Sequence, residues 1–382
     1  MIGVAVLGST GSIGRQTLEV IRAAPDRYRL TGLAAGHAGE ALDRQVREWP
    51  QASAWSADGQ PADLDSTRWA AGGLEELATA DGVDIVVVAT TGMTALPAVL
   101  AALRSGRRVA LANKEALVTG GHLVRAALPS AAEDRLDWLR PVDSEHSAIW
   151  QCLRGERIED VARLILTASG GPFRDRSPEA LAEVTPVEAL AHPTWQMGPK
   201  ITIDSATLVN KAFEAMEARW LYDLPYPRIA AVLHPGSVVH SLVEFVDGSY
   251  KAQLGLPDMR LPIQYALSYP ERHPSPARTA SPEEWQPLEF AALDPSHFPA
   301  YATVRAAAEA GGNRGAVLNA ADEVAVAAFL AGAIRFTQIA TTLEQAVARW
   351  GNDSEPTAAQ IADLDAEVRA ALMTEMGIEA RA

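Results

Sequence analysis

The chain has 382 residues, of which 48% are hydrophobic and 21% are charged, and its formal net charge is −15. This composition excludes an intrinsically disordered chain, and the acidic balance argues against nucleic-acid or membrane partners, which require basic surface. Cys152 is the only cysteine and no apolar run reaches about 18 residues, so we expect no disulfide, no transmembrane helix and a reducing, cytoplasmic location.

The first part of the chain alternates apolar strands with helical patterns. Strands are predicted at residues 2–7, 29–36, 83–90 and 107–113, with helices after residue 13 and over 95–106. Alternation of this kind is typical of a parallel, doubly wound sheet. We therefore predict an α/β fold that begins with a Rossmann-like nucleotide-binding domain at residues 1–143.

The pattern changes after this domain. Strands are predicted at 163–169, 228–235, 238–246 and 250–255, and their short connections indicate hairpins in a largely antiparallel sheet. This predicts a central α+β catalytic and dimerisation domain at 144–268, in which the long, proline-marked segment 170–199 is expected to be a lid. A proline-rich linker at 269–294 and a C-terminal helical domain at 295–382 complete the expected organisation.

The glycine-rich string "GSTGSIG" directly follows the first predicted strand. Gly8, Gly11 and Gly14 recur every third residue where the chain turns from a strand into a helix. Glycines at such a turn let backbone N–H groups approach a pyrophosphate at the positive end of the helix. This context favours a dinucleotide site over an empty loop.

The end of the second predicted strand bears on which dinucleotide binds. NAD-binding sites usually place an acid there, whereas this chain has Gly36, His37 and Ala38. The missing acid favours NADPH, whose 2′-phosphate an acid would repel. His37 is equally compatible with an ordinary surface histidine.

The stretch "RPVDSEHSAIW" places two acids around one serine. If the segment is extended, Asp143 and Glu145 point to the same side, where their charges repel each other unless something positive lies between them. A metal ion, a basic side chain and open water are the three alternatives.

A second polar segment is "KITIDSATLVNKAFEAMEARW", at residues 200–220. We expect Asp204 or Ser205 to cap a helix in which Asn210, Lys211 and Glu214 share one face. A solvated face with a weak surface ion pair is the ordinary interpretation. The functional one combines Glu214 with the two acids near residue 144 as oxygen ligands for Mg²⁺ or Mn²⁺, beside groups that suit a phosphate.

Two further segments carry candidate groups. "ALANKEALV" places Lys114 after a strand, where it is an exposed lysine, a proton donor or a group that neutralises an oxyanion. "LTASGGPFRD" ends a strand at Ser169, whose hydroxyl suits a phosphate. In the expected lid, Trp195 and Met197 either close over a substrate or anchor the loop.

Six motifs of the chain together resemble the 1-deoxy-D-xylulose 5-phosphate reductoisomerase family. In chain order they are "LGSTGSIG", "LANKE", "PVDSEHSAIWQ", "TASGGPF", "HPTWQMGPKITIDSATLVNKAFE" and "GLPDMRLPIQYAL", and the resemblance as a whole runs from residue 1 to about 330. The resemblance implies a rearrangement of a sugar phosphate, followed by hydride transfer that gives 2-C-methyl-D-erythritol 4-phosphate for isoprenoid synthesis. It also implies NADPH, Mn²⁺ or Mg²⁺ with Co²⁺ as a further candidate, and a homodimer.

The resemblance assigns roles to individual residues. The metal ligands are Asp143, Glu145 and Glu214, and the catalytic groups are Lys114, Glu145 and His192. The substrate-binding residues are Lys114, Ser144, Glu145, Ser169, His192, Trp195, Ser205, Asn210, Lys211 and Glu214. The residues that line NADPH are Thr10, Gly11, Ser12, Ile13, Gly36, Asn113, Glu115 and Gly198.

The chain departs from the family pattern at a few positions. His37 and Ala38 stand where a basic residue and an asparagine are common, which weakens the expected grip on the 2′-phosphate. Gly236 replaces a usual glutamine and Asp322 an expected asparagine, and the segment after residue 350 matches nothing in the family. Two rival functions remain: a metal-independent NADP-dependent sugar-phosphate dehydrogenase, and a non-catalytic NADPH sensor.

Overall fold

The computed structural model describes residues 1–382 except 62–63, 131–133, 195–196, 286 and 379–382. The chain forms two compact units. Unit 1 consists of Met1–Ala116, Leu123–Gln151 and Asp258–Ala280, and unit 2 consists of Leu117–His122, Cys152–Pro257 and Ser281–Ala382. The domain boundaries expected from the sequence, after residues 143, 268 and 294, stay a prediction.

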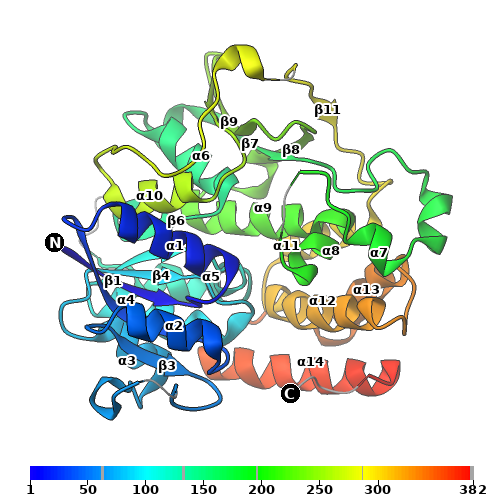
Figure 1. Cartoon of the computed structure of the whole chain (residues 1–382). Helices are drawn as coiled ribbons and strands as arrows, with labels where there is room; N and C mark the ends of the chain where they lie inside the picture. Colours follow the sequence, from blue (N-terminus) through cyan, green and yellow to red (C-terminus); the bar gives the residue numbers. More distant parts are fainter. Residues whose placement is uncertain (62–63, 131–133, 195–196, 286, 379–382) are drawn as a thin grey trace. The chain divides into compact units, whose positions relative to one another are not determined.

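Unit 1 contains a six-stranded sheet in which every pair of neighbours is parallel (Figure 1). The strand order is β3-β2-β1-β4-β5-β6, the order typical of dinucleotide-binding folds. The strands are β1 (Ile2–Leu7), β2 (Tyr28–Ala35), β3 (Ser53–Ser56), β4 (Ile85–Val88), β5 (Arg108–Leu111) and β6 (Leu139–Pro141). The predicted parallel α/β domain is thereby confirmed.

Helices accompany the strands of this sheet. They are α1 (Ser12–Ala23), α2 (Glu40–Glu48), α3 (Gly73–Thr79), α4 (Leu96–Arg104), α5 (Glu115–Ala127), α6 (Ser144–Leu153) and α10 (Arg260–Ser268). The central strands are apolar because both of their faces are covered: all four residues of β4 are buried. The edge strand β3 is short and half-buried, which explains why no apolar run announces it in the sequence.

Unit 2 contains a five-stranded sheet with the order β10-β9-β7-β8-β11. Its strands are β7 (Val161–Ala168), β8 (Ile229–Leu233), β9 (Val239–Phe245), β10 (Tyr250–Leu254) and β11 (Ala291–Ala292). Only β7 and β8 pair in parallel among these described strands, so the predicted largely antiparallel sheet is confirmed. The β9–β10 hairpin turns at the predicted short connection.

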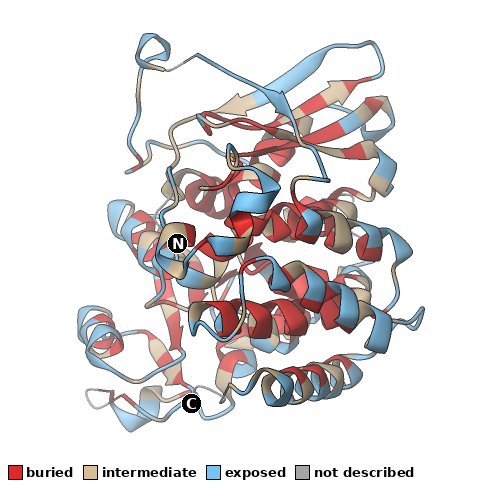
Figure 2. Cartoon of the chain, turned by 90° about the vertical axis from the view of Figure 1, so that its right-hand side faces the viewer, coloured by how far each residue is buried: buried red, intermediate tan, exposed pale blue. Residues whose placement is uncertain are grey.

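The remaining helices belong to unit 2 (Figure 1). They are α7 (Pro186–Ala189), α8 (Pro199–Thr207), α9 (Val209–Tyr222), α11 (Pro299–Ala310), α12 (Arg314–Leu330), α13 (Gln338–Trp350) and α14 (Ala358–Met376). Thirteen of the residues of α12 are buried, because α8, α11, α13 and α14 pack around it (Figure 2). The predicted helical C-terminal region is confirmed, and it includes the segment after residue 350.

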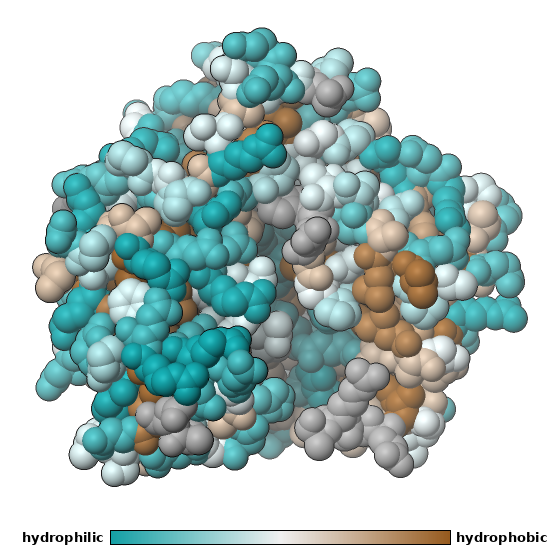
Figure 3. All heavy atoms as spheres, in the orientation of Figure 1, coloured by the Kyte–Doolittle hydropathy of each residue, from teal (hydrophilic) through white to brown (hydrophobic). Residues whose placement is uncertain are grey.

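Short 3₁₀ helices mark several turns. They are η1 (Ser66–Arg68), η2 (Met93–Ala95), η3 (Arg135–Asp137), η4 (Ile158–Asp160), η5 (Pro178–Glu183), η6 (Tyr226–Arg228) and η7 (Pro282–Glu284). Within the described part of the chain, no helix is both long and apolar enough to cross a membrane. The face drawn in Figure 3 is largely hydrophilic, as the charged fraction of the sequence predicts.

Candidate active site

The glycine-rich turn after β1 has the geometry that a pyrophosphate requires. Gly8 has φ +87°, and a Cβ on Gly14 would lie 2.2 Å from the Gly8 carbonyl oxygen. The Gly11 N–H donates to that same oxygen over 3.1 Å, and α1 begins at the next residue. The turn is therefore too tight for side chains at these positions. It places Thr10, Gly11, Ser12 and Ile13 at the positive end of α1.

The loop after β2 lies beside an acid from another part of the chain, which the local sequence does not reveal. The carboxylate of Asp58, which follows β3, accepts a hydrogen bond of 2.5 Å from the Ala38 N–H and lies 3.3 Å from Nδ1 of His37. The Ala38 N–H lowers the pKa of Asp58, with smaller contributions from Ser56 and His37. Residues 36–38 themselves contain no acid, as the sequence indicates, but the structure brings the Asp58 carboxylate beside them. Because β3 is the neighbour of β2, the acid comes from twenty residues further along.

Lys114 is buried and paired, so the interpretation of an exposed lysine is wrong. Its Nζ lies 3.0 Å from the Asp143 carboxylate, and the residue is only 7% exposed. The preceding Asn113 fixes this corner, since its side-chain amide donates to the carbonyls of Thr90 and Gly92 over 3.0 and 2.8 Å. Glu115 opens α5 and is also buried. A buried ammonium group is costly unless an anion pairs with it, and Asp143 is that anion for Lys114.

Asp143 and Glu145 do not lie along one extended strand, contrary to the prediction. β6 ends at Pro141 and α6 begins at Ser144, so the two acids stand at a strand-to-helix junction. Asp143 accepts the Ser144 N–H over 3.0 Å, which satisfies an otherwise unpaired donor of the first helical turn. The Ser144 hydroxyl donates to the Glu145 carboxylate over 2.5 Å. The positive group beside Asp143 in this structure is Lys114.

The polar face of α9 is buried, so its interpretation as a solvated face is wrong. Lys211 and Glu214 are 3% and 1% exposed, and they form an ion pair. The side-chain amide of Asn210 donates to the other Glu214 oxygen over 2.5 Å. One carboxylate thus accepts from two neighbours three and four residues earlier, as helical spacing allows. A buried charge must be satisfied in this way or neutralised.

Asp204 and Ser205 lie inside α8 and do not cap a helix, contrary to the prediction. The segment 200–220 forms two helices, because Leu208 adopts a left-handed conformation with φ 58° between α8 and α9. α8 begins after Gly198 with Pro199 at its first position, where a missing N–H costs nothing. Val209, Phe213, Met216 and Trp220 recur at helical spacing, which predicts an inward stripe; the first three are buried, and Trp220 is only half-buried.

His192 lies between two serines that the sequence places 36 residues apart. Its Nε2 is 3.1 Å from the hydroxyl of Ser169 and 3.1 Å from that of Ser205. Nδ1 accepts the Thr194 N–H over 3.2 Å, which assigns the proton of the neutral ring to Nε2. Burial lowers the pKa of His192, so the ring is neutral at pH 7 and donates toward the serines.

The turn before this cluster depends on two glycines. Gly170 and Gly171 have φ values of +85° and +64°, and the Gly171 N–H donates to the Ser169 hydroxyl over 3.2 Å. In the expected lid, Met197 is half-buried and Gly198 is exposed. Trp195 lies outside the described residues.

Lys200 joins two buried acids that sequence reasoning did not connect. Its Nζ lies 2.6 Å from Asp204 and 2.8 Å from Asp322, and both carboxylates are almost completely buried. Burial, and then the charge of Asp322, raise the pKa of Asp204 well above its usual value, against the opposing effect of Lys200. Asp322 occupies the position where the family pattern has asparagine. Its departure from that pattern is the one signal that could have identified this cluster.

Three family profiles match the chain in consecutive segments. The 1-deoxy-D-xylulose 5-phosphate reductoisomerase profile matches residues 4–121, the C-terminal domain profile of that enzyme matches 139–222, and the DXP reductoisomerase C-terminal domain profile matches 254–371. Together they cover most of the chain and both units. The third profile extends to residue 371, so the expectation that the segment after residue 350 matches nothing in the family is wrong.

Curated relatives of the same name are similar to the chain over nearly its full length. The 1-deoxy-D-xylulose 5-phosphate reductoisomerase of Thermomicrobium roseum is 51% identical over 359 residues, which cover 93% of this chain and 92% of the relative. That of Geobacillus kaustophilus is 48% identical over 383 residues, which cover 96% and 97%.

Solved structures of 1-deoxy-D-xylulose 5-phosphate reductoisomerases have the same fold as this chain. A structure of DOX-P reductoisomerase in complex with NADPH, fosmidomycin and magnesium is 36% identical, covers 99% of this chain and 98% of its own, and superposes with a TM-score of 0.88. A 1-deoxy-D-xylulose 5-phosphate reductoisomerase from Zymomonas mobilis in complex with NADPH is 37% identical, covers 98% and 99%, and has a TM-score of 0.83.

Proposed function

The chain belongs to the 1-deoxy-D-xylulose 5-phosphate reductoisomerase family, and from this premise we propose how its residues carry out the reaction. The protein is an NADPH- and divalent-metal-dependent enzyme that converts 1-deoxy-D-xylulose 5-phosphate to 2-C-methyl-D-erythritol 4-phosphate for isoprenoid synthesis. The observation that carries this conclusion is the identity of 51% with a curated relative over 93% of the chain.

Asp143, Glu145 and Glu214 are the residues that would hold the divalent cation, which we propose to be Mg²⁺ or Mn²⁺. The donor set fits: three carboxylates supply hard oxygen ligands, the kind that these cations prefer. Two of them now accept from the ammonium groups of Lys114 and Lys211, so each already lies in surroundings that stabilise negative charge. When bound, the cation supplies Lewis-acid chemistry worth several kcal/mol.

Lys114 would orient and neutralise the oxygens of the substrate. A lysine this buried keeps little conformational freedom, so its ammonium group is held in place before substrate arrives. Ser144 stands between the two junction acids and would donate its hydroxyl proton to a substrate oxygen when its bond to Glu145 is exchanged. Glu145 would accept or return a proton during the rearrangement.

The phosphate of the substrate would be bound by residues of unit 2. We assign this role to Ser169, Ser205, Asn210 and Lys211. The neutral ring of His192 supports the assignment, since its Nε2–H faces the first two hydroxyls and sets their orientation. Two hydroxyls, an amide and an ammonium group supply the donors that a phosphate dianion needs.

NADPH, which supplies the hydride, would be bound at the glycine-rich turn and at the carboxyl ends of the neighbouring strands. Thr10, Gly11, Ser12 and Ile13 would hold the pyrophosphate at the start of α1. Gly36, Asn113, Glu115 and Gly198 would contact the remainder of the cofactor. The Asn113 side chain is held by two carbonyls, so this corner is rigid before the cofactor binds.

We further propose that residues 170–199 form a lid that carries Trp195 and Met197 over the substrate and excludes water. The glycine pair at 170–171 supports this proposal at one end of the segment, because its left-handed conformations suit a hinge. The proline at the start of α8 supports it at the other end, where it fixes the chain into a stable helix.

A homodimer and a cytoplasmic location are also proposed. Strand β10 is an edge of its sheet, and Val246 and Tyr250 at the β9–β10 hairpin are 68% and 52% exposed. An open edge beside exposed apolar residues favours pairing with a second copy of the chain. The free, buried thiol of Cys152 supports a reducing compartment.

The function is tested by following NADPH oxidation with 1-deoxy-D-xylulose 5-phosphate in the presence of Mg²⁺, and again with an excess of chelator. We expect turnover only with the cation and its recovery when Mg²⁺ is restored. Turnover that ignores the chelator would favour the metal-independent dehydrogenase. NADPH binding without oxidation would favour the sensor.

A further inference from the structure

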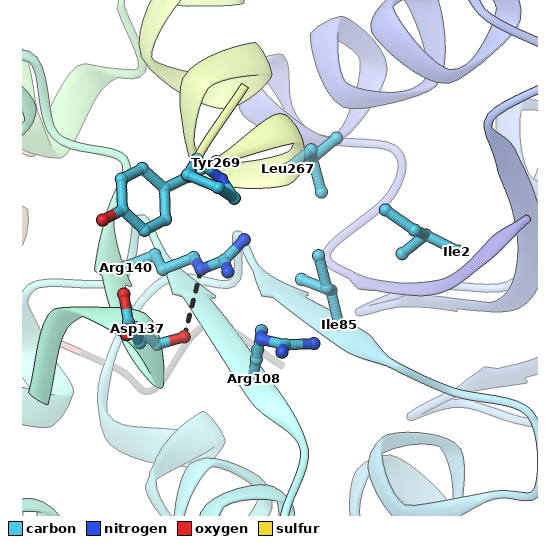
Figure 4. Close-up of a pocket in the computed structure, with 8 residues that line it drawn as sticks. Ile2, Ile85, Arg108, Asp137, Arg140, Leu267 and Tyr269 are labelled. Atoms are coloured by element: carbon cyan, nitrogen blue, oxygen red, sulfur yellow. Dashed lines mark hydrogen bonds between the residues drawn. The ribbon is translucent and has the colours of Figure 1, made fainter. Parts of the chain in front are cut away.

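Unit 1 contains a pocket at the edge of its sheet where the strands begin. The cavity measures about 400 Å³, and Ile2, Ile85, Leu267, Tyr269, Arg108 and Arg140 contribute to its lining (Figure 4). Ile2, Ile85 and Arg108 are the first residues of β1, β4 and β5. All strands of the sheet are parallel, so this edge is opposite the carboxyl ends that carry the glycine-rich turn and Asn113. The pocket is therefore separate from the proposed cofactor site.

Two guanidinium groups face this pocket, and neither has a carboxylate partner among the residues that the structure describes. Arg140 is only 4% exposed, yet it donates to two backbone carbonyls alone: Nε to Asp137 over 3.2 Å and an η nitrogen to Ala266 over 2.7 Å. The Arg108 guanidinium lies 5.9 Å from the ring centre of Trp138 and is exposed. Within the described ranges, no carboxylate oxygen lies within ion-pair distance of either arginine.

The two positive charges also repel each other. Burial, and then the charge of Arg108, lower the pKa of Arg140 to about 10. Asp137 favours the charged form of Arg140, but these two described residues form no ion pair. The excess of positive charge at the pocket therefore remains. In the view of Figure 4, Asp137 lies to the left of both guanidinium groups, Ile85 lies above that of Arg108, and Ile2 lies to the right. A buried arginine without an anion is costly, so the pocket favours an anionic ligand.

The other half of the lining is apolar. Ile85 and Leu267 are almost completely buried, and Tyr269 places its ring 5.4 Å from the Arg140 guanidinium. A ligand that satisfied only the arginines would leave this apolar surface in contact with water. The volume and the mixture of apolar walls with a few convergent polar groups are typical of small-molecule sites.

We propose that this pocket binds a small organic phosphate, with the phosphate group between Arg108 and Arg140 and an apolar body against Ile2, Ile85 and Leu267. Guanidinium groups bind phosphate oxygens through paired, charge-assisted hydrogen bonds, and the η nitrogens of Arg108 have no acceptor among the described residues. The site is an addition to the reaction centre, and no step of the proposed reaction uses it.

Phenyl phosphate is a suitable probe, because it joins one phosphate to a compact apolar ring. Isothermal titration of the full chain with phenyl phosphate should detect binding that Arg108→Met weakens by at least about tenfold, the loss expected for one charge-assisted contact. Arg108 is exposed, so this variant should fold normally. Arg104→Met is the matched control, because Arg104 is also exposed but does not line the pocket. It should leave binding unchanged.

The proposed substrate-phosphate site could also bind the probe, so the titration is repeated in Lys211→Met. Binding that survives Lys211→Met and is lost in Arg108→Met supports the pocket. Binding that is lost in Lys211→Met while denaturant unfolding shows that this variant is still folded, or that is equal in Arg108→Met and the unaltered chain, overturns the proposal. Arg140→Lys provides a second variant, since it keeps the charge and removes the guanidinium fork, and it should also weaken binding.

Inorganic phosphate and benzoate separate the two halves of the proposal. Inorganic phosphate should bind more weakly than phenyl phosphate, because it leaves the apolar lining uncovered. Equal affinities for inorganic phosphate and phenyl phosphate would contradict the proposal that the ligand has an apolar organic body. Benzoate binding as tightly as phenyl phosphate would overturn the phosphate assignment and point to a carboxylate ligand.

Discussion

The charged side chains on the polar face of α9 are buried, whereas those at the loop after β2 are exposed to solvent. On α9, Lys211 and Glu214 are buried and each finds its partner one helical turn away. After β2, His37 and Asp58 pair across two loops while their side chains are 81% and 47% exposed. The first pair lies in a low-dielectric interior, where losing a partner is expensive, and the second lies in water, where it is not.

This difference fits the departure from the family pattern at residues 37 and 38, but it does not account for the buried departure at Asp322. A substitution on α9 leaves a buried charge without a partner, so the polar set tolerates little change. A substitution in the loop after β2 is absorbed by solvent, so the chain can place His37 and Ala38 where relatives commonly have other residues. We therefore expect substitutions on the polar face of α9, which we call the substrate end, to cost much free energy. Substitutions in the loop after β2, the cofactor end, should cost little.

The largest expected effect tests the substrate end. Glu214→Gln keeps the size of the side chain and removes its charge, so turnover should fall by about 10³-fold, the rate equivalent of several kcal/mol of lost metal assistance. Steady-state NADPH oxidation at saturating Mg²⁺ measures it. Asp322→Asn is a matched control, since Asp322 is also a buried acid of unit 2 but is not a proposed ligand. Similar losses in both variants would contradict the assignment.

The next effect concerns stability. Lys211→Met leaves the Glu214 carboxylate buried without its ammonium partner, and we expect a loss of about 3–5 kcal/mol in the free energy of unfolding. Lys251→Met removes an ion pair with Glu156 that is 47% and 31% exposed, and should cost less than about 1 kcal/mol. Denaturant unfolding of both variants measures the contrast. Adding Glu214→Gln to Lys211→Met should restore part of the loss; equal losses in the two lysine variants would break the comparison.

A third test uses the buried acids that Lys200 joins. The raised pKa of Asp204 means that the folded chain binds a proton that the unfolded chain has released. This contribution to stability is complete below the unfolded pKa near 3.8 and is lost as the pH rises toward the folded pKa. The slope for one proton reaches about 1.4 kcal/mol per pH unit. Asp322→Asn should flatten it, and an unchanged slope of stability against pH would contradict this account.

The smallest effect concerns the cofactor end. Asp58→Asn removes a negative charge beside His37 and Ala38, and the Michaelis constant for NADPH should fall by about two- to fivefold, because the site is exposed and screened. NADH, which lacks the 2′-phosphate, is the control and should change less. A larger Michaelis constant for NADPH in the variant would show that Asp58 organises the loop rather than repelling the phosphate.

Much of the fold could be predicted because its signals are local. The apolar run of β4 and the glycine-rich turn before α1 each report their own structure, since periodicity and glycine placement act within a few residues. The junction at Asp143–Ser144 was missed because helix initiation there depends on a strand that ends only two residues earlier. Leu208 was missed because a left-handed leucine has no sequence signature.

The candidate site was less predictable because its contacts are not local. Lys114 and Lys211 looked like surface residues until the structure showed that both are buried, and burial is a property of the whole fold. Asp58 and Asp322 contact residues that are distant in the sequence, so the residues around each acid do not predict its role. The resemblance to the family named the site residues, while their pairing came from the structure.

The central claim is that Asp143, Glu145 and Glu214 hold one cation. The most direct measurement is Mn²⁺ binding, followed by electron paramagnetic resonance, to the unaltered chain and to Asp143→Asn, Glu145→Gln and Glu214→Gln. The account predicts one tight Mn²⁺ site in the unaltered chain, weakened by at least about tenfold in each variant, since each loses one charged ligand. A variant that binds Mn²⁺ as tightly as the unaltered chain would remove its residue from the site and contradict the claim.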